Sequence, residues 1–115
     1  MVDKSLILVT LNIRQFDNSN NLIYSGSIPV GVEEHETFSD LLRRMIESSE
    51  IKSEIKQDLK SCLSNQSGHR GFVFYVVSEN GERVVVNLRD KVAEVSRHHG
   101  TSQIGMDIFP IVGSQ

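Results

Sequence analysis

Several side chains in this sequence have the chemistry that metal binding or catalysis requires. Four histidines, one cysteine and two Ser-x-x-Lys runs stand out: His35, His69, His98, His99, Cys62 and residues 49–52 and 53–56. A metal site needs several His, Cys or carboxylate ligands at matched spacing. The adjacent His98 and His99 point in different directions on any regular element, and no partner at ligand spacing accompanies them. The sequence therefore predicts no metal site and no cofactor, with this pair in a solvated loop.

The acidic residues around His35 are a second candidate cation site. Glu33, Glu34 and Glu36 could supply oxygen ligands, but the run has neither the spacing nor the glycine of a calcium-binding loop. Acidic residues just before a helix are explained by the positive end of the helix dipole. We therefore expect a structural role for these carboxylates.

Cys62 is the strongest candidate nucleophile. It falls on the same helical stripe as Ile55 and Leu59, and free cysteine is among the most often buried residue types, so we expect a buried core cysteine rather than a reactive one. The Ser-x-x-Lys runs lack the companion motifs of a serine acyl enzyme. Residues 68–71 (GHRG) precede a strand instead of a helix, unlike a phosphate-binding loop. No nucleophile, base and orienting group are assembled, so we expect no enzyme.

Composition narrows the class of protein further. A chain of 115 residues with 38% hydrophobic residues predicts one domain, residues 1–115, with a single core. A net charge of −3 disfavours a nucleic-acid binder, whose surface is usually strongly basic. A lone cysteine favours a reducing, cytoplasmic setting. No apolar run reaches the about 18 residues of a membrane span, and the first residues lack the order of a signal peptide, so we expect no membrane partner.

Hydrophobic periodicity predicts strands and helices in a mixed order. Period-2 alternation predicts strands at residues 6–13 and 22–32, joined as a hairpin. A continuous β-branched and aromatic run predicts a strand at 72–77 that is covered on both faces, and further apolar runs predict strands at 83–88 and 104–112. Helical spacing predicts a main helix after Thr37, which forms a capping box with Asp40, then helices at 51–63 and 89–95. Asn80 and Gly81 predict a type I′ turn, and residues 97–102 a polar loop.

This order of elements predicts an α+β fold. A hairpin followed by a helical crossover brings the last strand beside the first, because such crossovers are right-handed and short. The expected arrangement is a β-grasp (ubiquitin-like) mixed sheet with a main helix, an extra helix and a short third helix. Pro29 lacks an N–H group and should lie at a sheet edge or at a bulge.

The segment from Asp107 to Ser114, DIFPIVGS, carries a family resemblance. It resembles the closing strand of sulfur carriers of the molybdopterin-synthase small-subunit type, and it is similar to the β-grasp region of tail-assembly proteins from lambda-like phages. The first resemblance implies action through a free C-terminal Gly-Gly; this chain has Gly113, Ser114 and Gln115 there. The second implies a role in phage tail or virion assembly.

The leading hypothesis is a non-enzymatic protein-interaction module, because β-grasp proteins commonly dock through the outer face or an open edge of the sheet. The predicted contact residues are Ile23, Ile28, Pro29, Arg83 and Val85. Pairing of sheet edges could also join copies of this chain into a homo-oligomer. Alternatively, Pro29 and the charges at Glu82 and Arg83 only protect the edges from aggregation. The second hypothesis is a ubiquitin-like or sulfur-carrier-type protein acting through Gly113, Ser114 and Gln115.

Overall fold

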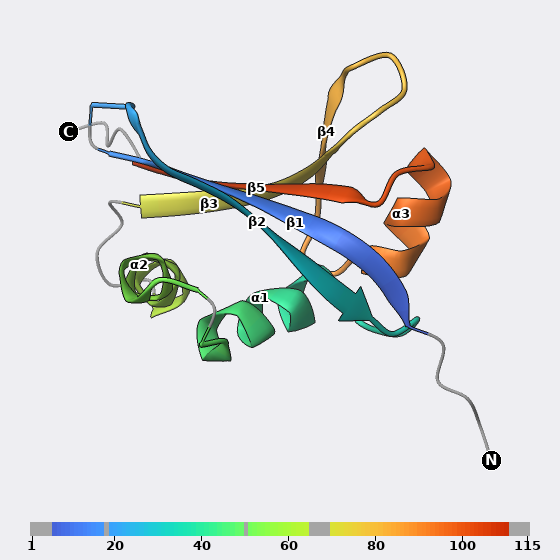
Figure 1. Ribbon diagram of the computed structural model, residues 1–115, viewed down its shortest axis with the longest axis horizontal. Helices are drawn as coiled ribbons and strands as arrows, with labels where there is room; N and C mark the ends of the chain where they lie inside the picture. The colour runs from blue at the N-terminus through green and yellow to red at the C-terminus, as the bar shows by residue number, and fades with distance from the viewer. Residues whose placement is uncertain (1–5, 18, 50, 65–69, 111–115) are drawn as a thin grey trace.

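The fold is a five-stranded mixed sheet with three helices, an α+β architecture (Figure 1). The computed structural model describes residues 6–17, 19–49, 51–64 and 70–110. Its elements, in chain order, are β1 (Ile7–Phe16), β2 (Leu22–Val32), α1 (Phe38–Glu47), α2 (Ser53–Ser64), β3 (Arg70–Val77), β4 (Arg83–Val86), α3 (Val92–His99) and β5 (Gln103–Pro110). The described helices include none that is both long and apolar enough to cross a membrane.

The sheet has the strand order β2-β1-β5-β3-β4, and β5 is its middle strand. β1 and β5 run parallel, with Leu11 opposite Ile104 and Ile13 opposite Met106. The other neighbouring pairs, β1–β2, β3–β5 and β3–β4, are antiparallel. The prediction that the last strand inserts beside the first is therefore confirmed.

One face of the sheet forms the hydrophobic core together with the helices. Alternate residues of β1 and β5 point into it, and α1 and α2 lie on this side (Figure 1). Burying one such aliphatic side chain contributes about 1.5–3 kcal/mol. The fully buried residues of these two strands are Val9, Leu11, Ile13, Ile104, Met106 and Ile108.

The capping box predicted for the start of α1 is confirmed. The Asp40 amide donates to Thr37 Oγ1 at 3.2 Å, and the Thr37 amide donates to Asp40 Oδ2 at 3.0 Å. The segment before α3 accepts from two further amides of the first turn: Phe38 donates to the Asp90 carbonyl and Ser39 to that of Leu88, both at 3.0 Å. These bonds satisfy donors that a helix start leaves unpaired.

The turn between β3 and β4 differs from the predicted type I′. Gly81 has a φ of 83°, but Asn80 does not have a positive φ. The Gly81 amide donates to the Ser78 carbonyl at 2.9 Å, and the Ser78 amide donates to the Glu82 carbonyl at 2.8 Å. This pattern fits a three-residue loop in which a left-handed glycine follows a tight turn. Only Gly81 needs the left-handed conformation.

The predicted boundaries of α3 were wrong. A helix at 89–95 followed by a loop at 97–102 was expected, but α3 runs from Val92 to His99 and ends at Gly100, with φ 61°. A left-handed glycine just after the last turn is a common helix stop. Leu88, expected to face inward, is 37% exposed because it lies before the helix starts.

Other boundaries differ less. The extra helix, expected at 51–63, is α2 at 53–64. Ile51 is buried just before this helix, and Ile55 and Leu59 are buried within it. The Cys62 side chain lies outside the described part, so its predicted burial stays a prediction. β1 extends beyond residue 13 to Phe16, β4 stops at Val86, and residues 111–112 of the predicted last strand are not described.

Replacing Gly81 by alanine should destabilise the protein by about 1–2 kcal/mol, because a Cβ is unfavourable in the left-handed conformation. The matched change Asn80→Ala should cost less than about 0.5 kcal/mol, as expected for an exposed position with ordinary backbone angles. Urea unfolding followed by circular dichroism measures both. Equal losses for the two variants would show that the turn is assigned wrongly.

Candidate functional site

The second face of the sheet has no described helix packed across it. α1 and α2 lie on the opposite side, and α3 lies beside one end of the sheet (Figure 1). Large apolar side chains are exposed on this open face: Leu8 is 67% exposed, Val85 63% and Val77 47%. The prediction that the third strand would be covered on both faces is therefore wrong at Val77. Exposed apolar groups that lie together often mark a binding surface.

The strand register places the open-face residues in rows across the sheet. Asn12 is opposite Ser27 and Gly105, and Tyr75 is opposite Gly105 and Val85. The next row is formed by Ser25, Arg14, Asp107 and Val73. Side chains from strands far apart in the sequence therefore meet on one surface.

The Asp107 carboxylate is the centre of this surface. Its Oδ1 accepts from Arg14 Nε at 2.9 Å and from the Tyr75 hydroxyl at 3.2 Å. Its Oδ2 accepts from Arg14 Nη2 at 2.7 Å and from Arg83 Nη1 at 3.3 Å. Only 9% of the Asp107 side chain is exposed. A buried charge is tolerated when it is paired and hydrogen-bonded, and here β1, β3 and β4 all supply donors.

Tyr75 and Arg83 stack above Gly105. The Tyr75 ring lies so close to Gly105 that a Cβ at this position would collide with it. The Arg83 guanidinium lies over the other side of the ring, 4.3 Å from its centroid, in cation–π geometry. Glycine at 105 thus lets the ring lie flat on β5, and the ring supports the half-exposed Arg83.

The pairing shifts two pKa values. The hydrogen bond to Asp107 is the main cause that raises the pKa of Arg14 above its ordinary value, so this side chain stays charged. Burial is the main cause that raises the pKa of Tyr75, and the nearby Asp107 charge adds to it, while Arg14 and Arg83 act in the opposite direction. Both shifts keep Arg14 cationic and Tyr75 neutral around Asp107 at neutral pH.

A smaller polar chain extends the surface toward β2. The Ser27 hydroxyl donates to Asn12 Oδ1 at 2.6 Å, and Asn12 Nδ2 donates to Gln103 Oε1 at 3.0 Å. These side chains belong to β2, β1 and β5. The open face is therefore cross-linked by side-chain hydrogen bonds over most of its width.

The predicted contact residues do not all lie on this face. Arg83 and Val85 lie on the open face. Pro29, in the edge strand β2, is opposite Thr10 of β1. Ile23 is 56% exposed at the irregularity where β2 pairs with the end of β1. Ile28 packs against the core instead, because its position in β2 has the opposite parity to Pro29. Residues Gly113, Ser114 and Gln115 lie outside the described residues.

The sequence prediction missed Arg14, Tyr75 and Asp107 as site residues. A detectable signal was Asp107 itself, a charged residue within an apolar strand, since acidic residues are seldom buried without a partner. Its partners lie far away in sequence, at separations of 93, 32 and 24 residues, so spacing could not reveal them.

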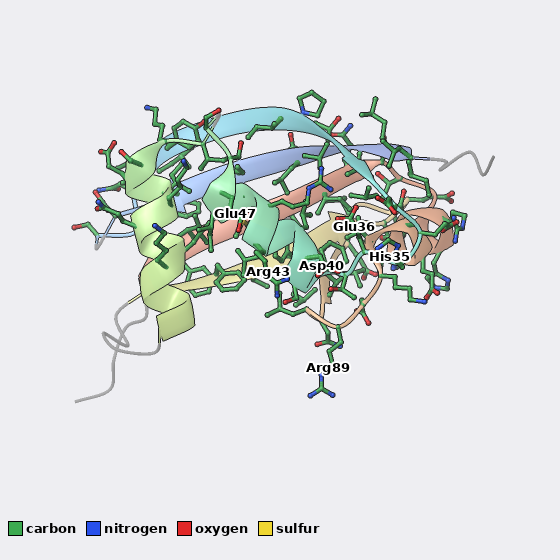
Figure 2. The ribbon with its side chains drawn as sticks, turned by 90° about the horizontal axis from the view of Figure 1, so that it is seen from below. His35, Glu36, Asp40, Arg43, Glu47 and Arg89 are labelled. Carbon is green, nitrogen blue, oxygen red and sulfur yellow. The ribbon has the colours of Figure 1, made fainter. Side chains whose placement is uncertain are left out.

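Charged residues on the helix side of the sheet form hydrogen bonds with one another (several are labelled in Figure 2). Glu36 accepts from Arg44 Nη1 at 3.1 Å, and Glu34 accepts from Arg97 Nη1 at 2.6 Å. Figure 2 shows Asp40, Arg43 and Glu47 along α1, with His35 beyond its start. Within the described residues, no group of three or more His, Cys, Asp or Glu side chains is placed to hold a metal ion.

The histidine pair lies on a helix, which corrects the predicted loop. His98 and His99 occupy the last turn of α3, with their ring centroids 4.8 Å apart in an edge-to-face contact. His98 is exposed and His99 is partly buried. Two groups at a helix C-terminus are well placed to interact with its dipole when protonated.

Two grooves lie beside the sheet. A cavity of about 170 Å³ between β2 and α1 is smaller than the about 300–1,000 Å³ of typical small-molecule sites. A shallower groove of about 620 Å³ runs between β4 and α3. Most of its charged lining is already engaged: Lys91 pairs with Glu94 at 3.9 Å, Arg97 pairs with Glu34, and Asp90 accepts from the Asn87 amide. The open face is therefore the better candidate site.

No protein-family model and no curated protein matches this chain. Among solved structures it is similar to Staphylococcal Superantigen-Like protein 3, with 16% identity over 92% of this chain and a TM-score of 0.43. It is also similar to a superantigen-like protein from Staphylococcus aureus, with 10% identity over 95% of this chain and a TM-score of 0.41. The chain spans about half of these structures, 53% and 54%. At such TM-scores the similarity carries neither fold nor function to this chain.

Replacing Asp107 by asparagine should destabilise the protein by about 1–3 kcal/mol, because charge-assisted bonds are lost and the two arginines repel. The control Glu94→Gln removes an exposed carboxylate from a 3.9 Å pair with Lys91 and should change stability by less than about 0.5 kcal/mol. Thermal and urea unfolding measure both variants. A loss for Asp107→Asn no greater than the control would contradict the central role of this carboxylate.

Tyr75 should ionise above the ordinary tyrosine value of 10.0, because burial and Asp107 disfavour the phenolate. In a Tyr24→Phe background, absorbance near 295 nm follows Tyr75 alone. A pKa raised in the folded state stabilises the protein below the unfolded value, and this contribution is lost as pH rises through the folded pKa. Adding Asp107→Asn should lower the pH midpoint of the Tyr75 titration. An unchanged titration midpoint would refute the contact between Tyr75 and Asp107.

Proposed function

We propose that this chain is a β-grasp domain that acts as a non-enzymatic protein-interaction module and docks through the open face of its sheet. The strand order β2-β1-β5-β3-β4, with β1 and β5 parallel and α1 between the first hairpin and β3, supports the β-grasp assignment. Fold alone does not fix function, so the docking role depends on the surface itself.

The observation that carries the proposal is an exposed apolar set on a surface whose polar side chains are already fixed. Val77 and Val85 are exposed beside the bonded group of Asp107, Arg14 and Tyr75, and Leu8 is exposed farther along β1 on the same face. Ordering flexible side chains at an interface opposes binding by about 0.5–1.5 kcal/mol for each one. Side chains that are held before the partner arrives avoid most of this loss.

The β2 edge of the sheet is less suited to docking than the open face. The Thr10 amide donates to the Ser102 carbonyl, toward β5, so the backbone nitrogen of its partner Pro29 faces the outer edge of β2. Proline has no N–H to offer an added strand. Arg44 Nη1 also donates to the Gly31 carbonyl at 2.8 Å, which occupies another group of β2. Such features protect an edge strand from pairing, which favours the open face over homo-oligomers joined through β2.

The other hypotheses stay predictions. The ubiquitin-like or sulfur-carrier role depends on Gly113, Ser114 and Gln115, and nothing in the described residues favours it over docking. A role in phage tail or virion assembly, and a cytoplasmic setting, likewise stay expectations from the sequence.

The proposal is tested by comparing proteins captured from the native host by three versions of the full chain. Val85→Asp places a charge on the open face, and Glu47→Lys places one on the exposed side of α1. Both positions are exposed, so both variants should fold as judged by circular dichroism. We expect wild type and Glu47→Lys to retain a common partner that Val85→Asp loses. A partner kept by Val85→Asp but lost by Glu47→Lys would contradict docking through the sheet.

A further inference from the structure

We propose that the open face binds an acidic protein segment in which a carboxylate side chain is flanked by apolar residues, with Arg83 as its principal contact. This inference rests on the proposed docking function and specifies the chemistry of the partner.

The charge of this face is opposite to that of the chain. The sequence carries a formal net charge of −3. The charged side chains that the described strands place around the centre of the open face are Arg14, Arg83 and Asp107. Glu79 and Glu82 belong to the turn beyond Val77. Two cations around one carboxylate leave a positive centre between the strands, with the carboxylates of Glu79 and Glu82 at the adjoining turn, and this centre favours an anionic group on the partner.

The hydrogen-bonding capacity of the group also points to an acceptor. A carboxylate offers about four acceptor positions, and Asp107 already receives four of the bonds described above. A guanidinium has about five N–H donors. Among the described residues Arg83 uses only Nη1 on Asp107, and its side chain is 52% exposed. The group can therefore accept little more from a partner but can still donate, which suits a bidentate carboxylate.

The apolar side chains flank Arg83 closely. Val77 pairs directly with Arg83 across β3 and β4, and Val85 is two residues further along β4 on the same face. Both are about half exposed or more. A partner carboxylate on Arg83 would therefore have apolar neighbours on either side. The described part of this face carries two arginines and no further basic side chain; such a small cationic area favours a carboxylate on a protein over the extended phosphate backbone of a nucleic acid.

The test is a peptide array whose members have the core apolar–X–apolar, with Asp, Glu, Gln or Lys at X and Val, Leu, Ile or Phe on either side. Fluorescently labelled full-length chain is the probe. We expect binding to Asp and Glu cores about tenfold stronger than to Lys cores, weakening with added salt because an exposed charge contact is screened. A duplex DNA oligomer serves as the nucleic-acid probe and should not compete.

Two arginine variants locate the contact. Arg83→Gln should weaken binding to acidic cores about fivefold or more, whereas Arg43→Gln, on the exposed side of α1, should leave it unchanged. Circular dichroism and unfolding confirm that both variants fold.

The outcomes separate the acidic partner from docking itself. If the chain binds Gln, Lys and Glu cores equally and Val85→Asp still abolishes this binding, the acidic partner is overturned and docking on this face is retained. Binding that Val85→Asp leaves intact, or binding to no core, would overturn both, and competition by DNA would overturn the protein ligand.

Discussion

The Asp107 carboxylate links the last strand of the chain, β5, to three other strands of the sheet. β5 enters the sheet between β1 and β3, and Asp107 on its open face receives hydrogen bonds from Arg14 of β1, Tyr75 of β3 and Arg83 of β4. A carboxylate so little exposed would be strongly unfavourable without these partners. The placement of β5 and the polar surface therefore depend on each other.

The alternation of β5 explains why the two faces of the sheet differ. Ile104, Met106 and Ile108 are fully buried on the helix side, and Gly105 and Asp107 lie between them on the other side. Glycine leaves room for the Tyr75 ring, and aspartate provides its hydroxyl with an acceptor. One short strand thus completes the apolar core and organises the open face, where Arg83 is held on the ring.

The strands and helices could be predicted from the sequence better than the site, because local patterns of residues indicate them. Alternating residues located β1 and β2, and the Thr37–Asp40 spacing located the start of α1. The end of α3 could not be predicted from periodicity because its last turn, Arg97 to His99, is entirely polar and resembles a loop, and the helix stops only at the left-handed Gly100. The site needed tertiary information: Arg83 and Val85 were found as exposed residues of a hairpin, but the Arg14–Asp107 pair joins parallel strands at opposite ends of the chain.

The central claim is that Arg14 and Asp107 act as one unit across β1 and β5, and a double-mutant cycle tests it most directly. The unfolding free energies of wild type, Arg14→Gln, Asp107→Asn and the double variant are compared by urea denaturation. The account predicts strongly non-additive losses, with a coupling of about 1 kcal/mol or more, as found for residues that share a hydrogen-bonded ion pair. Losses that add within about 0.3–0.5 kcal/mol would show that the two side chains are independent and would contradict it.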